Sequence, residues 1–185
     1  MMFQKNKLSN KIKLIFLVHE GSAQTNLKAV KEAIGAGKIN AEISAIVSDS
    51  GSLPEFEKIL PDYICLAGWK KIIPEELIKK YRILNIHPGL IPDTTKGIVQ
   101  NPDGTNAVWN KGKFTTKAIQ NFFDQKATYA GSSIHFLTLN FDFGPVLGKT
   151  FEKIEDNDTV ESLYKRLKIK ENKLYVEVLE KLCKN

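Results

Sequence analysis

Two polar residues end an apolar segment near the middle of the chain. Asn85 and His87 lie two positions apart in LNIHPGLIPD (residues 84–93), and Pro88 and Gly89 follow at once. Alternate residues of a strand point to the same face, so the amide and the imidazole should share one face. Proline then takes the chain out of the sheet. This spacing favours a binding or catalytic pair over a strand that simply stops with a satisfied histidine.

An acidic residue between two phenylalanines is the second candidate. Asp142 lies in FDFGP (residues 141–145), a sequence typical of a tight turn. An apolar setting raises the pKa of a carboxyl group, whereas a neighbouring imidazolium lowers it. Such a carboxylate can accept a proton or hold a histidine in orientation. The alternative is an aspartate that hydrogen-bonds only within its own turn.

A third candidate lies on the apolar stripe of the last expected helix. Glu171 lies four residues after Leu167 and three before Leu174, so it belongs to the core-facing stripe. An unpaired carboxylate is costly there. A contact with a substrate is one solution. The other is a break in the helix near residues 169–172 that exposes the side chain.

The loop after the first apolar strand is a candidate phosphate site. In HEGSAQTN (residues 19–26), backbone N–H groups near a helix start could face a phosphate. Thr25 is the expected cap of that helix. A dinucleotide fingerprint needs three glycines, and this loop has only Gly21, so a nicotinamide or flavin role is poorly supported.

These candidates need a scaffold, and the apolar pattern predicts one. Strands alternate with helices in the first half, which predicts a Rossmann-like, mostly parallel α/β sheet with helices on both faces. Such sheets bind ligands beyond the carboxyl ends of their strands. The expected strands are residues 13–19, 42–47, 62–67 and 82–86, and the expected helices are residues 25–35 and 75–81.

The second half has a different pattern. Residues 97–112 are rich in Gly, Asn, Asp and Pro, which predicts a loop, and residues 115–123 should form a helix. Two strands, residues 132–139 and 146–154, should form an antiparallel part of the sheet. A long amphipathic helix over residues 159–182, capped by Asp158, should end the chain.

Composition limits the classes of protein that fit. The 185 residues suit a single domain over residues 1–185, with residues 1–12 as a loose basic tail. Cys65 and Cys183 lack metal-ligand spacing, which favours reduced thiols in a cytoplasm and no metal. The net charge of +6 favours anionic partners. We expect a solvated basic surface rather than a nucleic-acid site, no membrane span, and an oligomeric state that could be a homodimer.

Taken together, these motifs resemble the folate-dependent formyltransferases, most closely those that act on glycinamide ribonucleotide in purine synthesis. The resemblance covers most of residues 13–182. It is carried by KLIFLVH with TNLKAV, by PDYICLAGWKKIIP, by LNIHPGLIP, by GSSIHFLTLNFDFGPVLGK and by KENKLY. It implies formyl transfer from 10-formyltetrahydrofolate as co-substrate to a phosphate-bearing amine, with no metal.

The resemblance also implies roles for individual residues. Asn85 would polarise the formyl carbonyl, His87 would stabilise the oxyanion or relay a proton, and Asp142 would pair with His87 and help to take the proton of the attacking amine. Glu171 would contact the amine substrate. The pterin would lie against the turn of Asp142, with Asn85, and the backbone of Trp69, Lys70, Lys71, Ile72 and Ile73. The substrate phosphate would lie at Gly21, Ser22, Thr25 and Asn26.

Three departures from the family pattern concern the amine-substrate side. The segment between Val47 and Asp62 is short, residues 97–130 are longer than expected, and the turn after the first strand is altered. Lys168 and Val176 also replace typical residues. Two alternatives therefore stay open. One is a formyltransferase for a nucleotide-linked amino sugar, and the other is a non-catalytic folate- or nucleotide-binding module.

Overall fold

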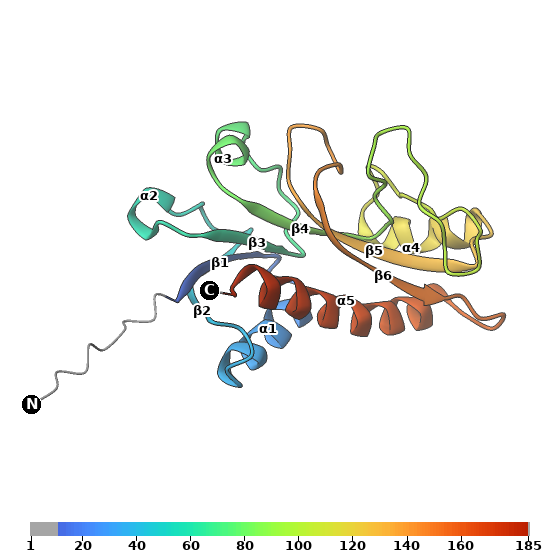
Figure 1. Cartoon of the computed structure of the whole chain (residues 1–185), viewed down its shortest axis with the longest axis horizontal. Coiled ribbons are helices and arrows are strands. Elements are labelled where there is room, and N and C mark those ends of the chain that lie inside the picture. Colours follow the sequence, from blue (N-terminus) through green and yellow to red (C-terminus); the bar gives the residue numbers. More distant parts are fainter. Residues whose placement is uncertain (1–10, 185) are drawn as a thin grey trace, which may run out of the picture.

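The structure, a computed structural model, describes residues 11–184. Six strands form one sheet in the order β2-β1-β3-β4-β5-β6 (Figure 1). The strands are β1 Ile12–Val18, β2 Ala41–Ser48, β3 Tyr63–Ala67, β4 Ile83–His87, β5 Tyr129–Phe136 and β6 Val146–Lys153. The helices are α1 Thr25–Gly35, α2 Phe56–Ile59, α3 Glu75–Lys80, α4 Thr115–Asp124 and α5 Val160–Leu182.

The pairing confirms the predicted sheet. Strands β2, β1, β3 and β4 are parallel to one another, and β5 is antiparallel to both β4 and β6. Residues 1–10 of the predicted basic tail lie outside the described residues, and Ile12 already belongs to β1. Within residues 11–184, no helix is both long and apolar enough to cross a membrane.

Alternate strand residues build a separate core on each face of the sheet. Leu14 and Phe16 of β1 pack with α1 and α5, around Tyr175. Ile15 and Leu17 face the other way and pack with Phe56 of α2 and with α3. The central strands are therefore covered on both sides, which explains their continuous apolar runs. Figure 1 shows α5 lying along the sheet on the side of α1.

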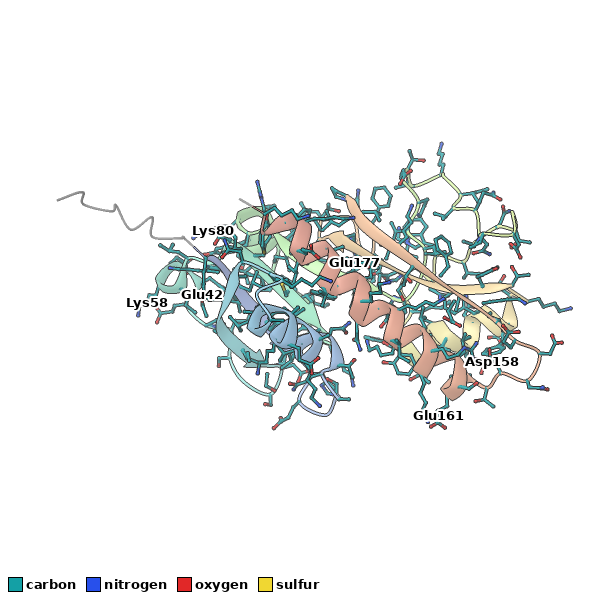
Figure 2. All side chains as sticks on the ribbon, turned by 60° about the horizontal axis from the view of Figure 1, so that its bottom comes forward. Glu42, Lys58, Lys80, Asp158, Glu161 and Glu177 are labelled. Atoms are coloured by element: carbon teal, nitrogen blue, oxygen red, sulfur yellow. The ribbon has the colours of Figure 1, made fainter. Side chains whose placement is uncertain are left out.

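Two helix caps differ from the predictions. The N-cap of α1 is Gln24, in a left-handed conformation and without a side-chain cap, so Thr25 is the first residue of the helix rather than its cap. The N-cap of α5 is Thr159, which shares a capping box with Ser162. Asp158, at the start of α5 in Figure 2, instead binds the guanidinium of Arg166. The charged hydrogen bonds with Arg166, eight residues away, are stronger than the cap that Asp158 could form with the backbone of α5.

The largest shift from prediction concerns β5. This strand begins at Tyr129 and ends at Phe136, three residues earlier at each end than expected. Gly131 lies inside it because Leu90 fills the space where a Cβ would be. The side chain of a loop residue thus explains why a glycine sits inside a strand, which is otherwise unfavourable.

Candidate active site

His87 is the last residue of β4 and is almost fully buried. Its Nε2 donates to the carbonyl oxygen of Trp109 at 2.7 Å. Its Nδ1 lies 3.5 Å from Oδ1 of Asp142. Both ring nitrogens therefore face oxygens, which hold the ring in one orientation.

Asp142 lies in the turn between β5 and β6, as predicted, but its partners lie outside that turn. Its Oδ2 accepts the backbone N–H of Gly112 at 2.7 Å. Burial raises the pKa of this carboxyl, but the hydrogen bond and charge of His87 and the Gly112 N–H outweigh it, so the pKa lies below its ordinary value. The alternative of an aspartate bonded only within its own turn is wrong.

Asn85 lies on the same face of β4 as His87 and contacts a residue that the sequence analysis did not single out. Its Nδ2 lies 3.4 Å from Nε2 of His135 on β5. His135 uses Nδ1 to donate to the carbonyl oxygen of Phe136, so its Nε2 is the acceptor. Burial and the charge of His87 lower the pKa of His135 to about 4, so this ring is neutral at pH 7. One amide N–H of Asn85 is oriented, and the other has no partner within residues 11–184.

Glu171 lies in a second cluster, on α5. The helix does not break, and the side chain is buried as the stripe predicted. Its two oxygens accept from Ser132 at 2.5 Å and from Lys168 at 2.7 Å. Lys168 also donates to Oδ1 of Asn26 at 3.0 Å. Burial lowers the pKa of Lys168, but the charge of Glu171 outweighs it and raises that pKa. The carboxylate is thus paired within the chain.

The two clusters lie on opposite faces of the sheet. Leu84 and Ile86 of β4 belong to the core under α1 and α5, so Asn85 and His87, which alternate with them, face the other side. We use "His87 cluster" for Asn85, His87, His135 and Asp142. We use "Lys168 cluster" for Asn26, Ser132, Lys168 and Glu171.

The turn after β1 leaves donors unused at the start of α1. Asn26 is 3% exposed, and its Nδ2 has no hydrogen-bond partner in the described part of the chain. The hydroxyl of Thr25 is likewise buried and unpartnered there. Without a side-chain cap, the first N–H groups of α1 are also free to bind an anion.

A basic pair borders this turn. His19 donates from Nδ1 to Asp49 at 2.7 Å, and its Nε2 accepts from Nζ of Lys70 at 2.8 Å. Asp49 also accepts the backbone N–H of Glu20. The three side chains come from the ends of β1 and β2 and from the loop after β3, and no motif in the sequence indicates that they meet. Gly21 and Ser22 lie beside them, because Ser22 donates to the carbonyl oxygen of His19.

The loop predicted to receive a pterin, residues 69–73, follows β3. Lys70 contacts His19, and Lys71 lies over the ring of Trp69 and reaches the carbonyl oxygen of Gly51. Ile72 is 89% exposed, whereas Ile73 is buried in the core. The indole N–H of Trp69 has no partner in the described part of the chain. Of the side chains of this loop, Lys70 therefore reaches the β1 turn, whereas Lys71 reaches the segment after β2.

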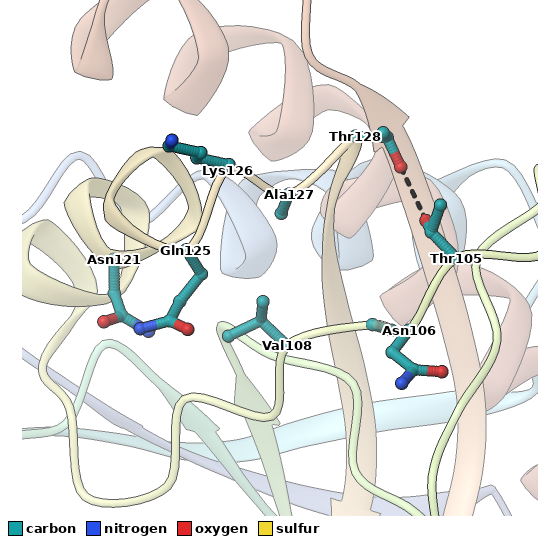
Figure 3. A pocket seen from close by; sticks show the side chains of 9 residues that line it. Thr105, Asn106, Val108, Asn121, Gln125, Lys126, Ala127 and Thr128 are labelled. Atoms are coloured by element: carbon teal, nitrogen blue, oxygen red, sulfur yellow. Dashed lines mark hydrogen bonds between the residues drawn. The ribbon is translucent and has the colours of Figure 1, made fainter.

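A surface cavity of about 470 Å³ lies between residues 105–108 and the end of α4 (Figure 3). Its lining includes Asn121 and Gln125 and none of the predicted site residues. Among residues 11–184 there is no group of three or more His, Cys, Asp or Glu side chains placed to hold a metal ion. Cys65 and Cys183 are both free and buried.

Comparison with known proteins places the chain in a family. A family model described as formyl transferase matches residues 52–179, so the chain belongs to the formyl transferase family. The chloroplastic phosphoribosylglycinamide formyltransferase of Arabidopsis thaliana is 35% identical over 148 residues, which cover 79% of this chain and 46% of that protein. The chain spans less than half the length of this relative and of a second plant relative, from Vigna unguiculata.

Solved structures agree with the fold. The phosphoribosylglycinamide formyltransferase of Brucella melitensis has a TM-score of 0.72 at 25% identity, over 95% of this chain and 97% of that one. The corresponding protein of Bacillus halodurans has a TM-score of 0.74 at 20% identity, over 92% and 94%. The resemblance seen in the sequence motifs is thereby confirmed at the level of family and fold.

Proposed function

We propose that the chain transfers a formyl group from 10-formyltetrahydrofolate to the primary amine of glycinamide ribonucleotide. The observation that carries this proposal is the approach of His87 Nδ1 to Asp142 Oδ1, 3.5 Å apart at the carboxyl end of β4, in a chain of the formyl transferase family. The printed names of the relatives, phosphoribosylglycinamide formyltransferases, support this acceptor.

The reaction requires charge to develop on the formyl oxygen. The amine nitrogen forms a bond to the formyl carbon, and the bond from that carbon to N10 of the folate then breaks. The free amide N–H of Asn85 and the His87 ring would stabilise the oxyanion between these steps. Asp142, whose pKa is lowered, is ionised at neutral pH and would take the proton that the amine loses. Tetrahydrofolate leaves with a proton on N10.

The acceptor phosphate would lie at the turn after β1. Support comes from the uncapped start of α1, from the unpartnered amide N–H of Asn26, and from Lys70 beside the turn. Gly21, Ser22 and Thr25 would contribute through their backbone and hydroxyl groups. Glu171 would act on the acceptor through its paired partner Lys168, which already reaches Asn26.

The folate would occupy the other side of His87. The backbone of residues 69–73 and the turn of Asp142 remain the proposed pterin contacts, with Asn85 toward the formyl group. Neither a metal nor any other cofactor enters this chemistry. A cytoplasmic location and a homodimer stay predictions.

The test is turnover by the full chain with 10-formyltetrahydrofolate and each of three acceptors. These are glycinamide ribonucleotide, a nucleotide-linked amino sugar, and water alone. We expect tetrahydrofolate and formylated glycinamide ribonucleotide to appear together, and Asn85→Ala to lower kcat by about 10²–10³. The matched control Gln120→Ala, an exposed residue of α4, should keep full activity. Turnover with the amino sugar alone would reject the acceptor. Folate binding without turnover would favour the alternative of a non-catalytic binding module.

A further inference from the structure

The His87 cluster is held by a segment to which the sequence assigned no catalytic contact. Residues 109–112, here the Trp109 segment, lie within the long stretch 97–130 that departs from the family pattern. The carbonyl oxygen of Trp109 accepts from Nε2 of His87, and its indole Nε1 donates to the carbonyl oxygen of Asp142 at 3.0 Å. Gly112 donates its backbone N–H to the carboxylate of Asp142. One short segment thus contacts both members of the pair.

The Trp109 segment is itself fixed from behind. Asn110 is 4% exposed and adopts a positive φ of 61°, which asparagine tolerates better than most residues. Its Nδ2 donates to the carbonyl oxygens of Pro88 and Ala118, and its Oδ1 accepts from Asn121. Asn121 lines the cavity of Figure 3. Each polar atom of the Asn110 side chain is therefore bonded, as a buried amide requires.

Close packing holds the chain after His87 against the backbone of Trp109. A Cβ on Gly89 would lie 1.9 Å from the carbonyl oxygen of Trp109, so only glycine allows this approach. The ring of Trp109 also packs on Phe143, with ring centroids 5.8 Å apart. Asp142, between these contacts, has a φ of 49°, a conformation that a non-glycine residue rarely adopts without support from its surroundings.

We propose that Trp109 is a positioning residue that holds His87 and Asp142 within reach of one another. The inference rests on the proposed function for its kinetic consequence but not for its geometry. The indole N–H stabilises the backbone of Asp142 in its left-handed conformation. The Gly112 N–H then aligns the carboxylate, and the Trp109 carbonyl fixes the ring of His87. Trp109 acts through its contacts with His87 and Asp142.

The direct test is Trp109→Phe, which keeps an aromatic ring against Phe143 and removes the N–H donor. We expect kcat to fall about tenfold, because the variant loses one hydrogen bond and His87 and Asp142 are slightly displaced. KM for both substrates should stay within about twofold of the wild-type values. Phe114→Leu, 69% exposed and close in sequence, is the matched control and should change neither constant. A kcat for Trp109→Phe within twofold of the wild type would overturn the proposal.

A second readout does not need turnover. The pKa of Asp142 is lowered by His87 and Gly112, so looser contacts in Trp109→Phe should raise it toward its ordinary value. Carbon-13 NMR titration of the Asp142 carboxyl measures this change. An unchanged titration would contradict the proposal. If the wild type shows no turnover but this titration shifts, the proposed function fails and the positioning role stands.

A third measurement guards against a variant that does not fold. In Asp142→Ala the Gly112 N–H loses its acceptor, so its amide hydrogen should exchange with solvent at least about tenfold faster than in the wild type. The Gly104 amide, bonded to Asn101 elsewhere, serves as the internal reference. Equal protection of Gly112 in both proteins would contradict the contact from which the proposal starts.

Discussion

The two polar clusters on opposite faces of the sheet differ in how their atoms are satisfied. In the His87 cluster, the ring nitrogens of His87 and His135 all meet oxygen or nitrogen atoms of the same chain. In the Lys168 cluster, a buried ion pair is complete, yet the amide N–H of Asn26 has no partner in the described part of the chain. The rings of the first cluster are preorganised, with one amide N–H of Asn85 left, whereas in the second cluster the buried amide of Asn26 is left for a ligand.

This contrast suggests a division of labour. Groups that stabilise a developing charge act best when they need no reorganisation during the reaction. Groups that bind a substrate must keep hydrogen-bond donors or acceptors unpaired until the substrate binds, which lowers the stability of the free protein. The preorganised cluster is therefore expected to control kcat, and the start of α1 is expected to control KM for the acceptor.

The largest effect is expected in the His87 cluster. Asp142→Asn keeps the shape of the side chain but removes the base and the partner of His87. We expect kcat to fall by about 10²–10⁴, the usual range for losing a general acid or base, with KM for the acceptor little changed. Steady-state kinetics measures this, with exposed Asp124→Asn as the control. A larger change in KM than in kcat would reverse the division of labour.

The ion pair of the Lys168 cluster should matter chiefly for stability. Lys168→Met leaves the Glu171 carboxylate, only 4% exposed, without its cation, which should cost about 3 kcal/mol of the free energy of unfolding. Urea denaturation at neutral pH measures the loss. Lys165→Met, whose pair with Glu161 is exposed, should change stability by less than about 0.5 kcal/mol.

The double variant Lys168→Met with Glu171→Leu sharpens this point. Replacing both charges by apolar groups should recover most of the stability, because the desolvation cost of the charges disappears. A double variant as unstable as the single one would show that the pair itself, and not the stranded carboxylate, carries the stability.

The neutral ring of His135 predicts a pH dependence. Between about pH 4 and 6.5 the unfolded chain binds a proton at this histidine and the folded chain does not. Stability should therefore fall as the pH drops through this window, by up to about 3 kcal/mol from this residue. Denaturation at several pH values should show a shallower fall in His135→Gln. An unchanged slope would mean that His135 is protonated in the folded state.

The smallest effect is expected at the start of α1. Asn26→Ala removes a buried N–H donor that the structure leaves unpartnered. We expect KM for glycinamide ribonucleotide to rise about tenfold, the worth of one hydrogen bond to a charged group, while KM for the folate stays constant. Exposed Lys31→Ala on the same helix is the control. An equal rise in both KM values would show that Asn26 does not separate the two substrates.

Local pattern predicted most of the scaffold. The bounds of α1 matched because periodic apolar residues begin and end with the helix, and the central strands β1 and β3 matched to within one residue because both of their faces are buried. The early start of β5 reflects the pairing of Tyr129 with Lys153 of β6, a partner distant in sequence that the local pattern does not indicate. The cap of α5 was misassigned because Asp158 has a stronger partner in Arg166.

The site was predictable only where side chains carry the chemistry. The sequence indicated Asn85, His87 and Asp142 by type and spacing, and the structure brings His87 and Asp142 together. The Trp109 segment could not be foreseen, because two of its contacts use a backbone carbonyl and a backbone N–H, which any residue provides. Contacts between side chains that lie far apart along the chain likewise cannot be predicted from a single sequence.

The proposed function is tested most directly by a crystal structure of the full chain with glycinamide ribonucleotide and an unreactive analogue of 10-formyltetrahydrofolate. The account predicts the formyl oxygen within about 2.7–3.2 Å of Nδ2 of Asn85, beside the ring of His87. It also predicts the acceptor phosphate at the start of α1. A formyl group bound elsewhere, with Nδ2 of Asn85 facing only protein atoms, would contradict it.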